Sequence, residues 1–402
     1  MLGETKALEV VRKAVELSGA DMTQASLSVS ESSLTRFANS IIHQNVSEKN
    51  AKFSVKAVIG KRIGYASTNR LDEESIAAVV EKAAAFARHS EENPDFVSLA
   101  RPGKIGSVDT YDPVTARYSP EERAHAVGDM IAEAAKFGAS AAGSFTTECD
   151  ESAVANSLGI SAYSPSSLAK LSTVMTAGDG HGYADQVSVH VKEIEPLAVA
   201  AEAASRAKRS RNPESIAPGE YTVVLLPYAV AEFIEFMAWL GLGALSVQEG
   251  RSFMAGKFGQ KVTGSNITIW DDGLDTRGIP VPFDPEGVPK QRVDLITNGV
   301  AKAVVYDSYT AHKEGRESTG HSTGGAGTWG PMPSNLFMKP GESSIEEMIA
   351  STDKGILVTR FHYVNVIHPT LTIITGMTRD GTFLIENGMV TKPLKNLRFT
   401  DS

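Results

Sequence analysis

The chain has 402 residues, which is enough for two or three domains with sizeable cores. Its 42% hydrophobic and 22% charged residues are ordinary for a soluble globular protein. A formal net charge of -9 argues against a nucleic-acid binder, which usually carries a basic patch or stripe.

The cysteine count and the apolar runs indicate the compartment. Cys149 is the only cysteine, so the chain can form neither an intrachain disulfide nor a zinc site built from several thiolates. The N-terminus lacks the basic start and long apolar run of a signal peptide. No apolar run approaches the roughly 20 residues of a membrane span. We therefore expect a cytoplasmic protein that binds neither nucleic acid nor membrane.

The first half contains an internal duplication, with copies at about 1–90 and 119–210. Hydrophobic periodicity predicts the same order in each copy, a helix, strands and a closing helix. In the first copy, helices are expected at 5–17 and 73–88, and strands at 25–30, 34–42 and 51–59. In the second copy, helices are expected at 120–137 and 194–208, and strands at 142–148, 153–163 and 169–177.

Short landmarks recur at nearly one offset between the copies. Gly64-Tyr65-Ala66 matches Gly182-Tyr183-Ala184, and Gly19-Ala20 matches Gly138-Ala139. We interpret the N-terminal region, 1–215, as an α+β domain made of two similar layers. Each layer is expected to be a helix pair on an antiparallel sheet, and the two layers to pack together.

Residues 221–245 form the most apolar stretch of this length in the chain. The pattern predicts a short buried strand, a break at Pro227 and a buried helix at about 229–240. Glu232 and Glu235 are three apart on this helix and so lie roughly on one face. Either acid is a candidate metal ligand or proton-transfer group. Because no histidine or cysteine is nearby, we favour the interpretation that both acids simply lie on the polar edge of the helix.

The region from 219 to 402 reads as β-rich, a barrel or sandwich with a buried helix. Short apolar runs alternate with strong turn signals, including Asn298-Gly299, Asp380-Gly381 and Asn387-Gly388. A further helix is expected at about 344–351. The whole chain is therefore predicted to be α+β.

The nine histidines do not form a recognisable metal site. A helical zinc site needs two histidines one turn apart with an acid beside them, and no pair has that spacing. His362 and His368 lie six apart on a predicted strand, about 20 Å along it, which is too far for joint ligands. We expect no metal in this chain.

Residues 306–330 are poor in large aliphatic residues and are expected to form a long loop. We interpret His312, His321, Gly324 and Gly325 as candidates for binding a peptide or a partner. A Ser-His hydrolase lacks its Gly-x-Ser-x-Gly elbow here. The glycine run also lacks the spacing and the following Lys-Ser/Thr of a phosphate-binding loop.

Further motifs follow the strand-Pro-helix in a fixed order, and the glycine-rich loop and the segment 34–40 belong to the same set. They are Asp271-Asp272-Gly273, Arg277-Gly278, Phe283-Asp284-x-Glu286-Gly287, Leu295-Ile296-x-Asn298-Gly299, Tyr306-Asp307-x-Tyr309-Thr310-Ala311 and Phe383-Leu384-Ile385-Glu386-Asn387-Gly388. This ordered set resembles the TldD/PmbA family, in which TldE is another name for PmbA. Members are described as modulators of DNA gyrase and as metallopeptidases.

The resemblance implies two kinds of subunit that pair around a proteolytic chamber for unfolded peptides. TldD-type chains carry a His-Glu-x-x-x-His helix and a C-terminal cysteine that hold zinc, whereas TldE/PmbA-type chains lack both. The helix after Pro227 has no histidine and the C-terminal region has no cysteine. The chain thus resembles the TldE/PmbA type, no catalytic residue carries over, and zinc is expected only in a TldD-type partner.

The leading hypothesis is a non-catalytic subunit of a TldD/TldE-type cytoplasmic metallopeptidase that acts on unfolded peptides. Whether this chain is itself an enzyme stays open. The alternative is a homodimeric, non-proteolytic binding or regulatory protein, including a modulator of gyrase. The sequence offers no physical support for the gyrase role.

Overall fold

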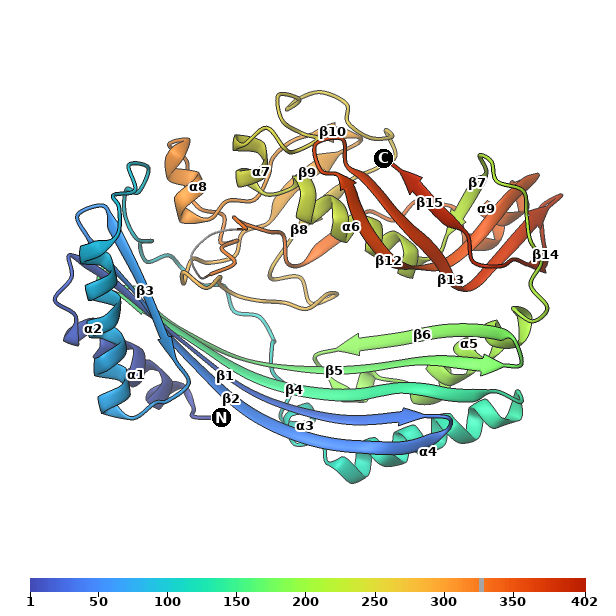
Figure 1. Ribbon diagram of the computed structural model, residues 1–402, viewed down its shortest axis with the longest axis horizontal. Coiled ribbons are helices and arrows are strands. Elements are labelled where there is room, and N and C mark those ends of the chain that lie inside the picture. Colours follow the sequence, from blue (N-terminus) through green and yellow to red (C-terminus); the bar gives the residue numbers. More distant parts are fainter. Residues whose placement is uncertain (325–328) are drawn as a thin grey trace.

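The computed structural model describes residues 1–324 and 329–402. A long curved sheet carries helices on one face, and the C-terminal region lies over the opposite, concave face (Figure 1). The mixed α+β class predicted from the sequence is confirmed. None of the helices in the described part of the chain is long and apolar enough to cross a membrane.

The N-terminal region repeats one order of elements. The first copy contains α1 (Glu4–Leu17), β1 (Met22–Ala38), β2 (Ile41–Ile59), β3 (Arg62–Thr68) and α2 (Glu73–His89). The second contains α4 (Pro120–Lys136), β4 (Ser140–Asn156), β5 (Ser161–Ala177), β6 (Gly180–Ser188) and α5 (Pro196–Arg209). Short helices α3 (Pro113–Ala116) and η1 (Val191–Glu193) precede α4 and α5.

The two copies share one sheet and are not stacked layers. The strand order is β3-β2-β1-β4-β5-β6, with β1 and β4 paired antiparallel from Gln24↔Asn156 to Phe37↔Gly143. The expectation of two packed layers was therefore wrong. Within its own copy, the first strand lies at the edge of the sheet and leaves backbone N–H and C=O groups unpaired. Pairing β1 with β4 satisfies these groups in both copies.

The strands are also longer than the pattern predicted. Separate strands at 25–30 and 34–42 were expected, but β1 runs unbroken from Met22 to Ala38. The polar run at 31–33 continues the ladder because it pairs on both sides, with β2 and with β4. The chain turns at Asn39 and Ser40, whose φ angles of 50° and 59° suit a two-residue hairpin.

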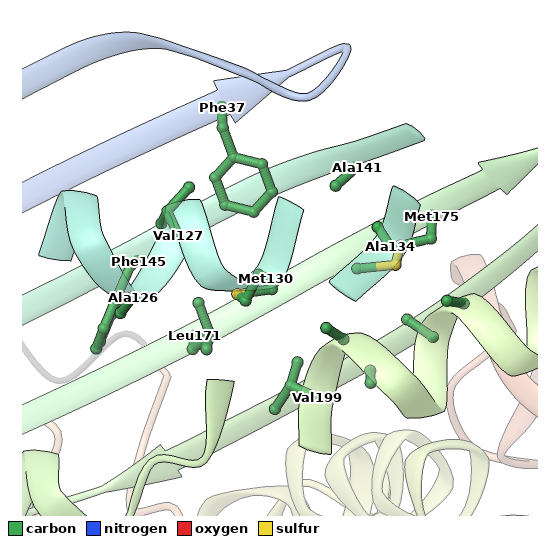
Figure 2. Packing of buried hydrophobic residues seen from close by; sticks show 14 of the residues in the cluster. Phe37, Ala126, Val127, Met130, Ala134, Ala141, Phe145, Leu171, Met175 and Val199 are labelled. Carbon is green, nitrogen blue, oxygen red and sulfur yellow. The ribbon is translucent and has the colours of Figure 1, made fainter. Parts of the chain in front are cut away.

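Alternating apolar side chains of the sheet pack against the helices. Phe37 at the end of β1 joins Phe145 and Leu171 of the second copy in one buried cluster with Val127 and Met130 of α4 (Figure 2). Because side chains alternate along a strand, the intervening polar residues point to the concave face. The sheet therefore has one apolar face and one polar face.

The recurring Gly-Tyr-Ala landmark marks a close approach of strand and helix. A Cβ atom added at Gly64 would lie 2.1 Å from the carbonyl oxygen of Ala83 in α2. At Gly182 it would lie 2.1 Å from the carbonyl oxygen of Ala203 in α5. Only glycine fits at either position, which explains why both copies carry it.

The C-terminal region contains two further sheets, ordered β10-β9-β8-β11 and β14-β13-β12-β7, with β15 beside β13. The strands are β7 (Thr222–Leu225), β8 (Ile269–Asp271), β9 (Val293–Thr297), β10 (Val300–Ala301), β11 (Leu336–Met338), β12 (Lys354–His368), β13 (Ile373–Glu386), β14 (Met389–Pro393) and β15 (Arg398–Asp401). The helices are α6 (Pro227–Gly241), α7 (Ala244–Gln248), α8 (Ser308–Lys313) and α9 (Ile345–Ala350). In the described residues these sheets do not close into a barrel.

Two of the three hairpin signals were confirmed. Asn298-Gly299 joins β9 to β10, and Asn387-Gly388 joins β13 to β14. Asp380-Gly381 is instead an irregularity inside β13, where the register against β12 shifts between Val358 and Arg360. The reason is local, because Asp380 turns inward to pair with Arg360.

The predicted helix after Pro227 is confirmed as α6, but it is not buried all round. Only Ala229, Ala238, Leu240 and Gly241 of this helix are fully buried. Trp239 is 41% exposed. Part of the apolar surface of α6 therefore faces solvent in this chain.

Candidate functional site

Two adjoining cavities lie between the concave face of the six-stranded sheet and loops of the C-terminal region. Their volumes are about 880 and 390 Å³. The sheet provides the floor, and residues 280–286 and 322–324 provide the roof of the larger cavity. The smaller cavity is completed by residues 91–99 and by α8.

The floor of the larger cavity is lined by hydroxyl groups. Ser28 of β1 lies opposite Ser152 of β4, and Ser152 lies opposite Ser164 of β5. The full set of serines on this floor is Ser26, Ser28, Ser30, Ser54, Ser67, Ser152, Ser164 and Ser166. Each hydroxyl can donate and accept a hydrogen bond while filling little space. Such a floor can satisfy the alternating donors and acceptors of an extended polar ligand.

The two roof segments are tied together by Asp284. One carboxylate oxygen accepts from the backbone N–H of Ser322 at 2.8 Å. The other accepts from the backbone N–H groups of Glu286 at 2.9 Å and Val288 at 3.0 Å. Asp284 therefore fixes the glycine-rich loop against the turn that follows Phe283.

A second buried carboxylate anchors the loop from behind. The ring Nε2 of His321 lies 2.7 Å from Oδ1 of Asp271, and its Nδ1 lies 2.9 Å from Oγ1 of Thr319. Oδ2 of Asp271 accepts from the backbone N–H groups of Ser334 and Asn335, each at 2.7 Å. Both side chains of the His321–Asp271 pair are fully buried, so the pair positions the loop and does not line the cavities.

Burial shifts the pKa of several groups in this anchor. Burial and the neighbouring Glu286 raise the pKa of Asp284 to about 7. Burial lowers the pKa of Lys290, against the opposing attraction of Asp271 and Asp284, and its Nζ donates to Oγ of Ser334 at 2.7 Å. Burial also lowers the pKa of His321, which favours the neutral ring.

The four loop residues predicted from the sequence have different surroundings. His312 lies in the last turn of α8 and lines the smaller cavity, and Gly324 lines both cavities. His321 is buried behind the roof. Gly325 lies outside the described residues. A binding role for the predicted set stays a prediction, with His312 and Gly324 placed to contact a ligand.

Glu232 and Glu235 lie on α6, away from both cavities. Burial and the charge of Glu235 raise the pKa of Glu232. The described residues contain no group of three histidine, cysteine or acidic side chains that could hold a metal ion. Two carboxylates without imidazole or thiolate do not fit zinc, so no step of a mechanism can be assigned to zinc on this helix.

The sequence reasoning missed Lys56, Asp284 and Glu286 as residues of the cavities. Asp284 and Glu286 were read only as parts of a turn. Lys56 alternates with Ser54 and Lys52 on one face of β2, and that polar face was the available signal. Nothing in the local pattern indicated that a loop more than 200 residues away covers this face.

Three sequence profiles of one family match the chain. They describe PmbA/TldA metallopeptidase domain 1 at residues 24–87, the central domain at 115–211 and the C-terminal domain at 218–402. Metalloprotease PmbA of Escherichia coli O157:H7 is 24% identical, and the match covers 97% of this chain and 87% of that protein.

A metalloprotease TldD homolog of Haemophilus influenzae is 33% identical over 150 residues, 36% of this chain and 30% of that protein. The matches with relatives at this level of identity thus span only about a third of their length. TldE from Thermococcus kodakarensis has the same fold, with a TM-score of 0.88 at 21% identity, covering 98% of this chain and 90% of that one. The chain belongs to the PmbA/TldD family, and its full-length matches group it with the PmbA/TldE-type members.

Proposed function

We propose that this chain is a non-catalytic, peptide-holding subunit of a cytoplasmic metallopeptidase. In this proposal a TldD-type partner binds zinc and cuts, and the present chain holds unfolded peptide. The observation that carries the proposal is the larger cavity with its serine-lined floor. An extended peptide exposes a backbone donor and acceptor at every residue, and hydroxyl groups can pair with both regardless of side-chain identity.

The helix α6 supports the assignment of cutting to another chain. Its sequence has no histidine, and it carries Phe233, Phe236 and Met237 on the helix that the resemblance matches to the zinc-binding helix of TldD-type chains. Phe233 is committed to packing, with its ring 4.8 Å from that of Phe361 and 6.0 Å from that of Phe399. The helix therefore has a structural role in this chain.

Exposed apolar groups provide a surface for the proposed partner. On α6, the ring of Trp239 lies 5.9 Å from Phe236 and 6.3 Å from Trp329, which is 65% exposed. The β12–β13 hairpin exposes Tyr363 and Leu371. Exposed aromatic groups of this kind are enriched at protein–protein interfaces.

Co-expression with a TldD-type chain from the same genome tests the proposal. Both chains should co-purify, and cleavage of an unfolded peptide should require both. Trp239→Ala should weaken the complex, whereas Leu17→Ala, at an exposed position on α1, should not. Absence of a complex, or equal cleavage without the present chain, would overturn the proposal.

The second candidate is a homodimeric binding or regulatory protein without proteolysis. The same exposed aromatic groups on α6 would suit a second copy of the chain. Light scattering, metal analysis and peptide assays on the purified chain distinguish the two. A stable homodimer that binds peptide but ignores the TldD-type chain favours this second candidate.

A further inference from the structure

The two cavities meet at a narrow place that we call the neck. Six residues line both cavities and define it: Lys56, Tyr65, Glu286, Ser322, Thr323 and Gly324. The first two belong to the floor and the other four to the C-terminal region. A ligand that extends from the larger cavity into the smaller one must pass between them.

Lys56 supplies a positive charge to the neck. Its Nζ lies 5.7 Å from the ring centre of Tyr65 and 6.0 Å from that of Phe96. Among the described residues Lys56 forms no ion pair, and residues 325–328, outside that description, carry no charged side chain. The half-buried ammonium thus lies near two aromatic rings, with no carboxylate oxygen of the described residues within 4 Å of it.

Glu286 does not neutralise Lys56. It is only 9% exposed, and its Oε2 accepts from the backbone N–H of Ser308 at 3.0 Å. This hydrogen bond ties the carboxylate to the start of α8.

The second copy provides an internal comparison. Lys56 pairs across the ladder with Tyr65, and at the equivalent place Val174 pairs with Tyr183. The cation over Tyr183 comes instead from Arg360, whose Cζ lies 3.9 Å from the ring centre. Arg360 is paired with a carboxylate, since its Nε donates to Asp380 at 2.8 Å. The cation over Tyr65 lacks that carboxylate.

We propose that the neck binds a carboxylate of the bound peptide through the ammonium group of Lys56. This inference rests on the proposed function, because it assumes a peptide in the larger cavity. The carboxylate is either the C-terminus of the peptide or an Asp or Glu side chain. The hydroxyl floor would then bind backbone without sequence preference, and Lys56 would set the register of the ligand.

Isothermal titration calorimetry with three peptides tests this proposal. The peptides are an N-acetylated Ala-Ser octapeptide with a free C-terminus, its C-terminal amide, and the amide with one internal Asp. A partly exposed charged hydrogen bond should favour the free acid by about fivefold, and the preference should fall with added salt. Lys56→Gln should remove the preference, so that the free acid and the amide bind this variant with equal affinity.

Lys52→Gln is the matched control, because Lys52 lies on the same face of β2 but lines only the larger cavity. It should keep the preference. Tighter binding of the Asp-containing amide than of the plain amide assigns a side-chain carboxylate to the neck. Equal affinities for acid and amides in the wild type, or a preference that survives Lys56→Gln, would overturn the carboxylate site. Failure of every peptide to bind would instead overturn the peptide-holding function itself.

Discussion

The two copies of the N-terminal repeat use one landmark tyrosine in different ways. Tyr183 in the second copy is covered by Arg360 and so contacts the C-terminal region directly. Tyr65 in the first copy lines a cavity, and among residues 1–324 and 329–402 the cation over its ring is Lys56 from the neighbouring strand. The C-terminal region therefore packs directly onto Tyr183 and leaves a cavity beside Tyr65.

This difference shows how a sheet built from two copies can form a cavity on one of its faces. The helix-facing side is constrained in both copies by the same packing, including the glycine before each tyrosine. The residues on the concave side can differ between the copies. Small polar side chains there can either contact the C-terminal region or line a ligand cavity. The Arg360–Asp380 pair lies at the contact over Tyr183, and Asp284 ties together the roof of the cavity that Tyr65 lines.

The largest expected effect is on the packing that both copies share. Gly182→Ala would place Cβ 2.1 Å from the carbonyl oxygen of Ala203, and Gly64→Ala meets Ala83 in the same way. Each change should lower the free energy of unfolding by about 3 kcal/mol or more, because the backbone must move. Denaturant titration measures this.

Gly128→Ala is the control, since an added Cβ on exposed Gly128 of α4 meets nothing within 4 Å. It should stabilise the chain by up to about 1 kcal/mol through helix propensity. A small loss at Gly64 with a large loss at Gly182 would mean that the two copies do not share this packing.

The next prediction concerns the stability that each of the two cations, Arg360 and Lys56, contributes. Arg360→Gln leaves the buried Asp380 with only the longer contact to Arg379, 3.9 Å away, and should destabilise the chain by about 2 kcal/mol. Lys56→Gln removes no ion pair in the described residues and should change stability by less than about 0.5 kcal/mol. Urea unfolding of both variants checks this, and equal losses would contradict the comparison.

Asp284 should give the roof a pH dependence. Its folded-state pKa of about 7 lies above the ordinary value for aspartate, so the folded chain holds this proton more tightly than the unfolded chain. That stabilising contribution is complete below about pH 4 and is lost as the pH rises through 7. Between pH 5 and 8, Asp284→Asn should gain about 2 kcal/mol relative to the wild type.

Asp275→Asn is the control for this titration. Hydrogen bonds from Arg277 lower the pKa of Asp275, so it stays ionised throughout that window. Its stability difference from the wild type should be the same at pH 5 and pH 8, as measured by urea unfolding in matched buffers. A flat difference for Asp284→Asn as well would contradict the raised pKa.

The smallest of these effects is expected when a lysine is placed in the second copy at Val174, the position equivalent to Lys56. Val174→Lys would add a second positive charge beside Tyr183, near Arg360. The like charges should cost about 1 kcal/mol at low salt and less at high salt. Val174→Gln controls for polarity, and a salt-independent loss equal for both variants would show that the charge is irrelevant.

The sequence was sufficient for the repeat, the α+β class and helix α6, because strong hydrophobic periodicity and the Pro227 break are local signals. It was insufficient for the shared sheet, because strand pairing between copies depends on free edges that no local pattern reveals. The same limit applies to the cavities. Lys56 and Asp284 are more than 200 residues apart, and only the placement of the C-terminal region brings their surroundings together.

Blocking the floor tests most directly whether this chain holds the peptide for a cutting partner. Ser28→Trp fills the serine-lined cavity, and Ser144→Trp, on the same face of the sheet but outside both cavities, is the control. The measurement is the rate of peptide cleavage by the TldD-type chain mixed with each variant, after co-purification shows that the complex forms. The account predicts at least a tenfold loss with Ser28→Trp and none with Ser144→Trp, and full activity with Ser28→Trp would contradict it.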